Sequence, residues 1–257
     1  MKRRGAALLL AGLFGLAGCE VPKPDASPPA PAPRPAPPEL TVVPQSDVSR
    51  AMSLHFAMLQ ADLLSKGLLR RDKGGPDVPF TERNLVENFI RIALYDEYVS
   101  NGGRIMAKET SSRLRRWDQP IRMKIEFGPS VPLAQRSKDR ANITAYTRRL
   151  SKLTGVPIRF THGMANFTVL VLNENERREA GPRLQALAPG ISPASVRAVT
   201  DLDRSTFCLV LAFSDDPKSA VYAKAVAVIR GEHPDLLRLS CIHEELAQGM
   251  GLPNDSP

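Results

Sequence analysis

The chain contains few of the residues that carry metal or thiol chemistry, with four histidines and three cysteines among 257 residues. It has no Cys-x-x-Cys pair, no P-loop, no glycine-rich dinucleotide fingerprint and no Gly-x-Ser-x-Gly nucleophile turn. These absences argue against nucleotide-binding enzymes, serine hydrolases with a nucleophile elbow and zinc sites built on paired cysteines. The hydrophobic content of 42% is nevertheless that of an ordinary globular protein.

An apolar run at residues 5–18 follows a basic start at residues 2–4. The run is too short to span a bilayer, and this order is typical of a signal peptide. Small residues stand directly before Cys19, which resembles the lipobox of bacterial lipoproteins. The resemblance implies that residues 1–18 are removed and that Cys19 carries lipid, facing the periplasm; Glu20 after the cysteine favours the outer membrane. An ordinary secretory signal is the alternative.

Residues 19–45 comprise this cysteine and a linker dominated by proline and alanine. Such a segment cannot form a helix, a sheet ladder or a core. It favours polyproline II at about 3.1 Å per residue, so the stretch from Pro22 to Pro38 can hold a domain roughly 50 Å from the membrane. We interpret it as a spacer.

The formal net charge is +8, and removal of residues 1–18 takes away three positive charges. A basic exported protein meets anionic lipid headgroups and cell-wall polymers before it meets nucleic acid. The expected partners are therefore the membrane, through the lipid anchor, and an anionic envelope polymer, with no nucleic acid.

Cys208 and Cys241 remain after Cys19 has been acylated. In an oxidising compartment a disulfide between them is favoured, and closing a loop of this length contributes about 4 kcal/mol in the chain-entropy treatment. Two buried free thiols are the alternative.

A helical segment is expected over residues 46–115. Ser46 has the position of a cap, and apolar residues at helical spacing follow it. Thr81 caps a second helix, whose apolar face runs through Val99 and which ends at the glycines that begin with Gly102.

After Trp117 the pattern changes to alternating or continuous apolar runs, which predict strands. The expected strands cover residues 121–127, 156–160, 166–172, 207–213 and 221–229. The expected helices cover residues 133–153, 174–187, 193–199 and 235–250. Residues 116–257 are therefore predicted to form an α/β (α+β) domain with a mixed sheet, in which the strand at 166–172 is central. His162 and His233 fall in expected loops and should be exposed.

The last expected helix carries the motif His243-Glu244-Glu245-Leu246-Ala247-Gln248, followed by Gly251-Leu252 and Asn254. It resembles the zincin motif, in which two histidines one helical turn apart hold Zn²⁺, a glutamate between them is the general base and a third ligand follows a glycine. Glu244 and Gln248 stand in the two histidine positions. Glu245 stands in the general-base position and Asn254 in the third-ligand position.

Oxygen ligands such as Glu244 and Gln248 suit a hard cation better than zinc. His243 would lie beside them as a proton carrier or ligand. The resemblance therefore implies a zincin-like domain that has lost standard zinc chemistry and uses no cofactor. A divalent metal ion at Glu244, Gln248 and Asn254 is the alternative.

A wider resemblance involves four stretches of the sequence: residues 87–99, 115–117, 165–172 and 241–248. Together they are similar to a family of proteobacterial lipoproteins defined as a domain of unknown function, over most of residues 80–256. The family implies no established activity. Its members continue past the Asn-Asp-Ser-Pro segment into an acidic region and further helices, so we expect no ligand or pocket wall from that region here.

Three functions remain open. The leading one is a membrane-anchored envelope lipoprotein with a binding or scaffold domain. The second is a divergent metal-dependent peptidase or amidase that uses Glu245 with His243, Glu244 and Gln248. The third is a module whose basic surface docks on anionic polymers.

Overall fold

A five-stranded mixed sheet organises the fold in the computed structural model, which describes residues 43–69, 79–101, 104–216 and 218–255. The strands are β3 (Ile121–Phe127), β4 (Ile158–Phe160), β5 (Phe167–Leu172), β6 (Cys208–Phe213) and β7 (Lys224–Arg230). Their order is β4-β3-β5-β7-β6; the first four are parallel, and β6 pairs antiparallel with β7 at the edge. The predicted mixed sheet with a central β5 is confirmed.

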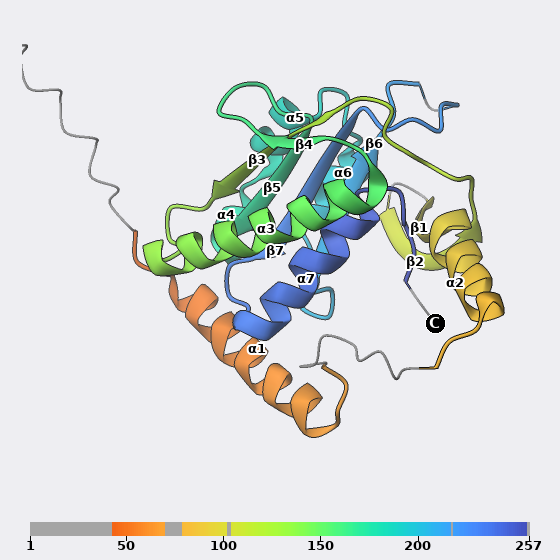
Figure 1. The fold of residues 1–257 in the computed structure, drawn as a ribbon. Coiled ribbons are helices and arrows are strands. Elements are labelled where there is room, and N and C mark those ends of the chain that lie inside the picture. The colour runs from red at the N-terminus through yellow and green to blue at the C-terminus, as the bar shows by residue number, and fades with distance from the viewer. Residues whose placement is uncertain (1–42, 70–78, 102–103, 217, 256–257) are drawn as a thin grey trace, which may run out of the picture. The chain divides into compact units, whose positions relative to one another are not determined.

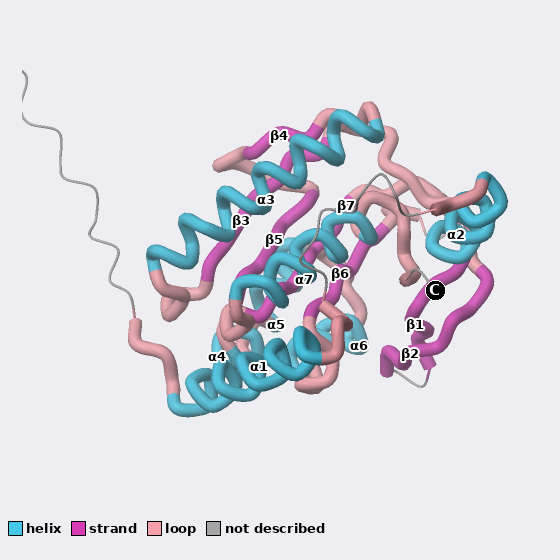
Figure 2. Tube along the Cα trace, turned by 60° about the horizontal axis from the view of Figure 1, so that its bottom comes forward, coloured by secondary structure: helices cyan, strands magenta, loops and turns pink. Residues whose placement is uncertain are grey.

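Helices cover both faces of the sheet (Figure 1). The helices are α3 (Leu133–Thr154), α4 (Glu174–Arg178), α5 (Gly181–Leu187), α6 (Pro193–Thr200) and α7 (Asp235–Gln248). On one face Ile143 of α3 and Ile242 of α7 join the main core. On the other face Leu184 of α5 and Val199 of α6 form a second apolar cluster. Helices lie on both sides of the sheet (Figure 2), and burial on both faces explains why β5 is apolar except at Thr168 and β7 is apolar between Lys224 and Arg230.

The expected helix over residues 174–187 is in fact two helices. Pro182 stands in the first turn of α5. Proline has no N–H with which to continue a helix, whereas it is well tolerated at a helix start. The chain therefore breaks between α4 and α5.

The segment before the sheet differs most from the sequence expectation. It contains α2 (Glu82–Leu94), β1 (Tyr95–Asn101) and β2 (Arg104–Ser111), and the two strands pair antiparallel. Thr81 caps α2 as predicted, but the predicted continuation of the helix through Val99 is wrong. Asn101 followed by glycines was interpreted as a helix end, but the same combination also favours a hairpin turn. The aromatic and β-branched residues that precede Asn101 favour a strand. The glycines at 102–103 lie outside the described residues.

The first helix, α1 (Asp47–Ser65), lies over the carboxyl ends of β5 and β7 (Figure 1). Ser46 caps it as predicted, because its Oγ accepts a hydrogen bond of 3.1 Å from the first turn. The buried ring of Phe56 meets the ring of His233 edge-on, with centroids 4.4 Å apart. His233 is only 2% exposed, so its predicted exposure was wrong: α1 closes over its loop. His162 is exposed, as predicted.

Buried ion pairs fill the same carboxyl edge of the sheet. Arg230 Nη1 donates to Glu174 Oε2 and Arg177 Nη2 donates to Glu174 Oε1, both at 2.8 Å. Buried charges are tolerated when they are paired and hydrogen-bonded in this way. Ligands of open α/β sheets commonly bind at this edge, but here its polar groups serve the structure beneath α1.

No helix within the described residues is long and apolar enough to cross a bilayer. Cys19 and the linker as far as residue 42 lie outside the described residues, whereas residues 43–45 are described, and the backbone N–H of Val43 donates to the carbonyl oxygen of Pro129 at 3.3 Å.

Candidate functional site

A cleft of about 910 Å³ is lined by the second half of α7, the edge strand β6, part of β1 and α6. Its volume falls within the range of small-molecule sites. Most of the charged lining groups are acidic, although the protein as a whole is basic. The acidic ones are Asp96, Glu97, Asp201, Asp203, Glu244 and Glu245, and the basic ones are Arg113, Arg115 and Arg197.

The end of α7 is fixed on the sheet by close packing. The indole Nε1 of Trp117 donates to the carbonyl oxygen of Gly249 at 2.8 Å, in a buried position. A Cβ at Gly249 would lie 2.6 Å from Cζ of Phe167, so only glycine allows this approach. Gly251 has φ +122°, which confirms a turn at the predicted glycine. These contacts determine where the motif residues of α7 lie.

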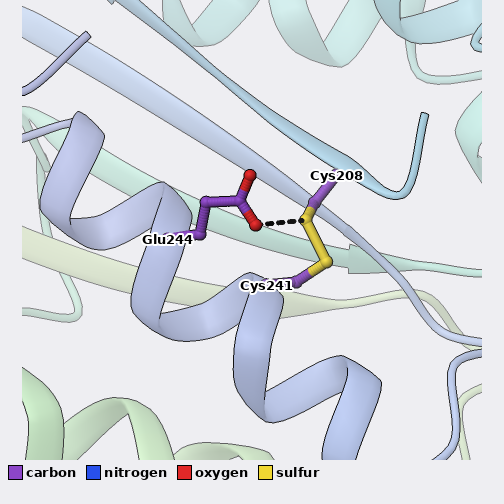
Figure 3. A group of neighbouring side chains, drawn as sticks. All are labelled: Cys208, Cys241 and Glu244. Carbon is purple, nitrogen blue, oxygen red and sulfur yellow. Dashed lines mark hydrogen bonds between the residues drawn. A yellow bond between two sulfur atoms is a disulfide. The ribbon is translucent and has the colours of Figure 1, made fainter. Parts of the chain in front are cut away.

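Cys208 of β6 and Cys241 of α7 form a disulfide with a Cα–Cα distance of 5.9 Å, as predicted (Figure 3). Glu244 lies beside it, with Oε2 3.9 Å from Sγ of Cys208. A disulfide sulfur carries no proton, so a hydrogen bond here requires the protonated carboxyl as the donor. The disulfide thus joins α7 to the strand that lines the cleft.

Glu244 and Gln248 both line the cleft from one face of α7, as their spacing predicted. The Nε2 of Gln248 donates to Oδ1 of Asp255 at 3.2 Å. Burial raises the pKa of Glu244 to about 7, and the nearby carboxylates of Asp255 and Glu97 add to this. Near neutral pH this side chain can therefore both give and take a proton.

Glu245 lies next to Glu244 in the wall of the cleft, but its side chain is nearly enclosed, with 1% exposed. Its Oε2 has no hydrogen-bond partner among the described residues. Burial, followed by the charges of Glu244, Glu97 and Asp255, raises the pKa of Glu245 well above its ordinary value. An enclosed acid without a compensating cation destabilises the folded state, and such groups cluster at functional sites.

Three further residues of this site were not predicted: Glu97, Tyr98 and Asp255. Burial raises the pKa of Glu97, and the neighbouring side chains of Tyr98 and Gln248 act in the opposite direction. Burial, then the charge of Glu97, raises the pKa of Tyr98. The backbone N–H of Glu97 donates to the carbonyl of Pro253 at 3.2 Å, which brings β1 to the end of α7. Only recognition of the hairpin could have placed Glu97 here.

His243 points to the other side of α7. Its ring stacks on Tyr146 of α3 with centroids 4.1 Å apart. Burial, then the charge of Arg149, lowers the pKa of His243. His243 is not among the described residues that line the cleft, so the structure does not bring this predicted proton carrier to Glu245.

Asn254 is buried and fastens the segment after α7 to the hairpin region. Its Nδ2 donates to the carbonyl of Arg91 at 3.2 Å and to Oε2 of Glu109 at 3.1 Å. It is absent from the described lining of the cleft. The structure therefore separates the predicted third ligand from Glu244 and Gln248.

The donor set does not fit a zinc ion. In the described part of the chain, one group of three histidine, cysteine or acidic side chains has its ligand atoms within 4.8 Å of one another: Cys208, Cys241 and Glu244. The two sulfurs of this group are joined in the disulfide, so neither is the thiolate that zinc requires. The carboxyls of Glu97, Glu244 and Glu245 are spread more widely. These side chains therefore do not form a zinc site of the zincin kind.

Fold and site together define a mixed α/β domain with an acidic cleft beside its last helix. The chain belongs to the family described as protein of unknown function DUF2927, whose sequence model matches residues 82–257. The match includes the hairpin, the sheet and α7, and it leaves α1 outside. Comparisons with curated proteins and with solved structures found no match.

Proposed function

We propose that this protein is a bacterial envelope lipoprotein, anchored through Cys19, whose α/β domain binds a ligand in the cleft beside α7. The anchor is supported by the basic start, the apolar run and the small residues before Cys19. The linker over residues 19–45 holds the domain on the periplasmic side, with the outer membrane as the preferred membrane. The zincin-like helix acts as a binding element without a cofactor.

The observation that carries the binding function is the enclosed carboxyl of Glu245 in the wall of the cleft. A neutral or apolar side chain at this position would make the fold more stable, because the acid has neither a cation nor a complete set of hydrogen bonds. The presence of a side chain that destabilises the folded state is explained if that side chain serves ligand binding. A bound ligand would supply the interactions that the carboxyl of Glu245 lacks.

Stabilisation by ligand tests this function. Small molecules and peptides extracted from bacterial envelopes should raise the melting temperature of the full chain, because a ligand that binds only the folded state stabilises it. The effect should be lost in Glu245→Gln and kept in Glu179→Gln, because Glu179 is an exposed residue at the end of α4 and does not line the cleft. Extracts that stabilise neither the parent nor the control would refute the proposal.

A divergent peptidase or amidase is the second candidate. Its support is the pair of adjacent carboxyls in one cleft, since Glu244 has a pKa of about 7 and so suits general acid–base catalysis. This alternative requires hydrolysis of peptides or amides by the parent protein and its loss in Glu245→Gln with the fold intact. The binding function requires that the parent hydrolyses neither.

A basic surface that docks on an anionic envelope polymer is compatible with this binding function. Exposed charge interactions are screened by salt. Binding to such a polymer should therefore weaken steeply as salt is added, and it should not depend on Glu245.

A further inference from the structure

We propose that the cleft takes an extended peptide segment, which joins the sheet as an additional strand along the free edge of β6. This inference rests on the proposed function, because it names the class of ligand for the same cleft. The peptide would be held by main-chain hydrogen bonds, as in other complexes in which a peptide extends a sheet.

The first support is that one edge of β6 has no neighbouring strand in the described part of the chain. β6 ends the strand order of the sheet, and its other edge pairs with β7. Among the described residues, the only backbone hydrogen-bond partner of β6 outside β7 is the N–H of Ala223, which directly precedes β7 and donates to the carbonyl of Phe213 at 2.8 Å. Every second residue of an edge strand directs its N–H and carbonyl groups away from the paired strand. About half of the six residues of β6 therefore present unpaired backbone groups at this edge.

The second support is that β6 borders the cleft along its whole length. All six residues of β6 belong to the cleft lining, together with residues of α6 and of α7. Six residues of extended chain occupy about 20 Å by 4.8 Å by 10 Å, or roughly 1,000 Å³. The cleft volume of about 910 Å³ is close to this value. The space beside β6 therefore matches one added strand.

The third support is that the residues of β6 do not protect its edge from pairing. Natural sheets keep edge strands short or place charged residues and proline in them, because an open edge pairs with other chains. The opposite edge strand, β4, follows this pattern, since it has three residues and includes Arg159. β6 has six residues, and none of them is charged or proline. An edge of this kind is explained if a ligand strand covers it.

The pleat of β6 predicts which side chains the peptide should carry. Val210 and Ala212 pack in the core on the side of α7, whereas Leu209 and Leu211 pack in the apolar cluster with α5 and α6. An added strand continues this alternation. Its side chains should therefore point in turn towards the polar motif residues of α7 and towards Ala198 of α6, which also lines the cleft. A peptide that alternates polar and small apolar residues meets both requirements.

Other occupants fit this edge less well. A helix satisfies its own backbone groups and is about 10 Å wide or more, so it cannot extend the ladder of β6. A second copy of the chain would have to bring the edge of its own sheet between the parts of α6 and β1 that also line the cleft. An oligosaccharide can form hydrogen bonds with a strand edge, but its donors and acceptors do not repeat at the spacing of a strand.

Calorimetric titration of the full chain with blocked peptides tests the proposal. The probe is acetyl-Thr-Val-Ser-Val-Thr-Val-amide. Two analogues carry N-methyl groups, one on its valines and the other on its hydroxyl residues, and the tetrasaccharide of N-acetylglucosamine represents the competing class. Ala198→Trp fills the cleft from α6, and the control Ala186→Trp places the same side chain at an exposed position of α5 outside the cleft lining. Circular dichroism reports that each variant is folded.

We expect the unmodified peptide to bind with a stoichiometry of one. Methylation of one set of amides should lower its affinity by about tenfold or more, which corresponds to about 1.4 kcal/mol. Methylation of the other set should have a smaller effect, because only alternate N–H groups of an added strand point towards β6. Ala198→Trp should lower the affinity to a similar extent, and Ala186→Trp should leave it unchanged.

Amide hydrogen exchange of the parent supplies a readout that needs no variant. Bound peptide should slow exchange at alternate residues of β6, because only the N–H groups on the free edge gain a partner. If Ala198→Trp does not fold, this pattern and the two methylated peptides decide the question.

Four results would overturn the proposal: equal loss of affinity in both methylated peptides, binding of the tetrasaccharide in place of the peptide, protection of the β6 amides by a second copy of the chain without peptide, or no binding of the peptide to the folded parent. If envelope extracts still stabilise the parent in a Glu245-dependent way, the binding function survives and only the ligand class is wrong. If extracts also have no effect, both proposals fail.

Discussion

The carboxyl of Glu244 lies 3.9 Å from Sγ of Cys208, across the boundary between α7 and β6 (Figure 3). The disulfide to Cys241 holds these two elements together one turn before the acidic motif. The geometry of the cleft therefore depends on a covalent link that forms in an oxidising compartment.

Removal of this link should destabilise the domain and weaken ligand binding. Because the cysteines are 33 positions apart in the sequence, the double variant Cys208→Ala/Cys241→Ala should lose roughly 3–4 kcal/mol of unfolding free energy in the chain-entropy treatment. Urea unfolding of the oxidised parent and the variant measures this loss. Equal stability of the two proteins would show that the link is dispensable.

The approach of Gly249 to Phe167 should make this glycine hard to replace. Gly249→Ala places a Cβ 2.6 Å from Cζ of Phe167 and should cost about 1–3 kcal/mol through overpacking. In the control Gly163→Ala the nearest atom is Oγ1 of Thr161 at 3.6 Å, so little loss is expected. Thermal unfolding compares the two, and similar losses would contradict the packing described here.

His243→Ala should separate structural from functional residues within the motif. Loss of the stacking on Tyr146 should cost about 0.5–1.5 kcal/mol. Ligand affinity should stay within about twofold of the parent, because His243 lies away from the described lining of the cleft. A large fall in affinity, measured as loss of the ligand's effect on the melting temperature, would show that His243 belongs to the site.

Much of the fold could be predicted from the sequence, because buried faces of helices and strands place apolar residues at regular spacing. The runs that became β3 and β5 alternate or stay apolar according to whether one or both faces are covered, and the helix after β3 matched its predicted span within a residue. The hairpin was missed because the helical spacing that defines α2 extends by chance into β1, where pairing with β2 overrides it.

The candidate site was only half predictable for a related reason. Glu244, Glu245 and Gln248 share one helix, so their spacing alone brings them together. Glu97 reaches them through the contact between β1 and Pro253, which no local pattern encodes. Asn254 matched the third-ligand position of the motif in sequence. In the structure its side-chain amide donates a hydrogen bond to the carbonyl of Arg91 and does not reach Glu244 and Gln248.

The anchor is tested by Cys19→Ser. The parent should fractionate with membranes and resist extraction by high salt, because lipid chains bind through apolar surface that salt does not screen. The variant should appear in the soluble periplasmic fraction. Recovery of the parent in the soluble fraction, or of the variant in membranes after a salt wash, would contradict lipid anchoring.

The effect of pH on stability follows from two neighbouring acids of the cleft, the exposed Glu244 and the enclosed Glu245. Their pKa values are higher in the folded state than the ordinary value of 4.5, through burial and the neighbouring charges of Glu97 and Asp255. The protonated forms therefore favour the folded state below about pH 4.5, and this contribution is lost as pH rises through the folded pKa, which for Glu244 is about 7. In Glu245→Gln the unfolding free energy should fall less as pH rises, because the contribution of the Glu245 carboxyl is absent.

The most direct test of the central claim is the unfolding free energy of the parent and Glu245→Gln in urea, at pH 8 and at pH 5. If Glu245 is retained for a ligand, the variant should be more stable than the parent at pH 8 by about 1 kcal/mol or more. The difference should shrink at pH 5, where the parent carboxyl keeps its proton in the folded state. A variant that is less stable than the parent at pH 8 would show that Glu245 serves the fold, and would contradict the account of the cleft as a binding site.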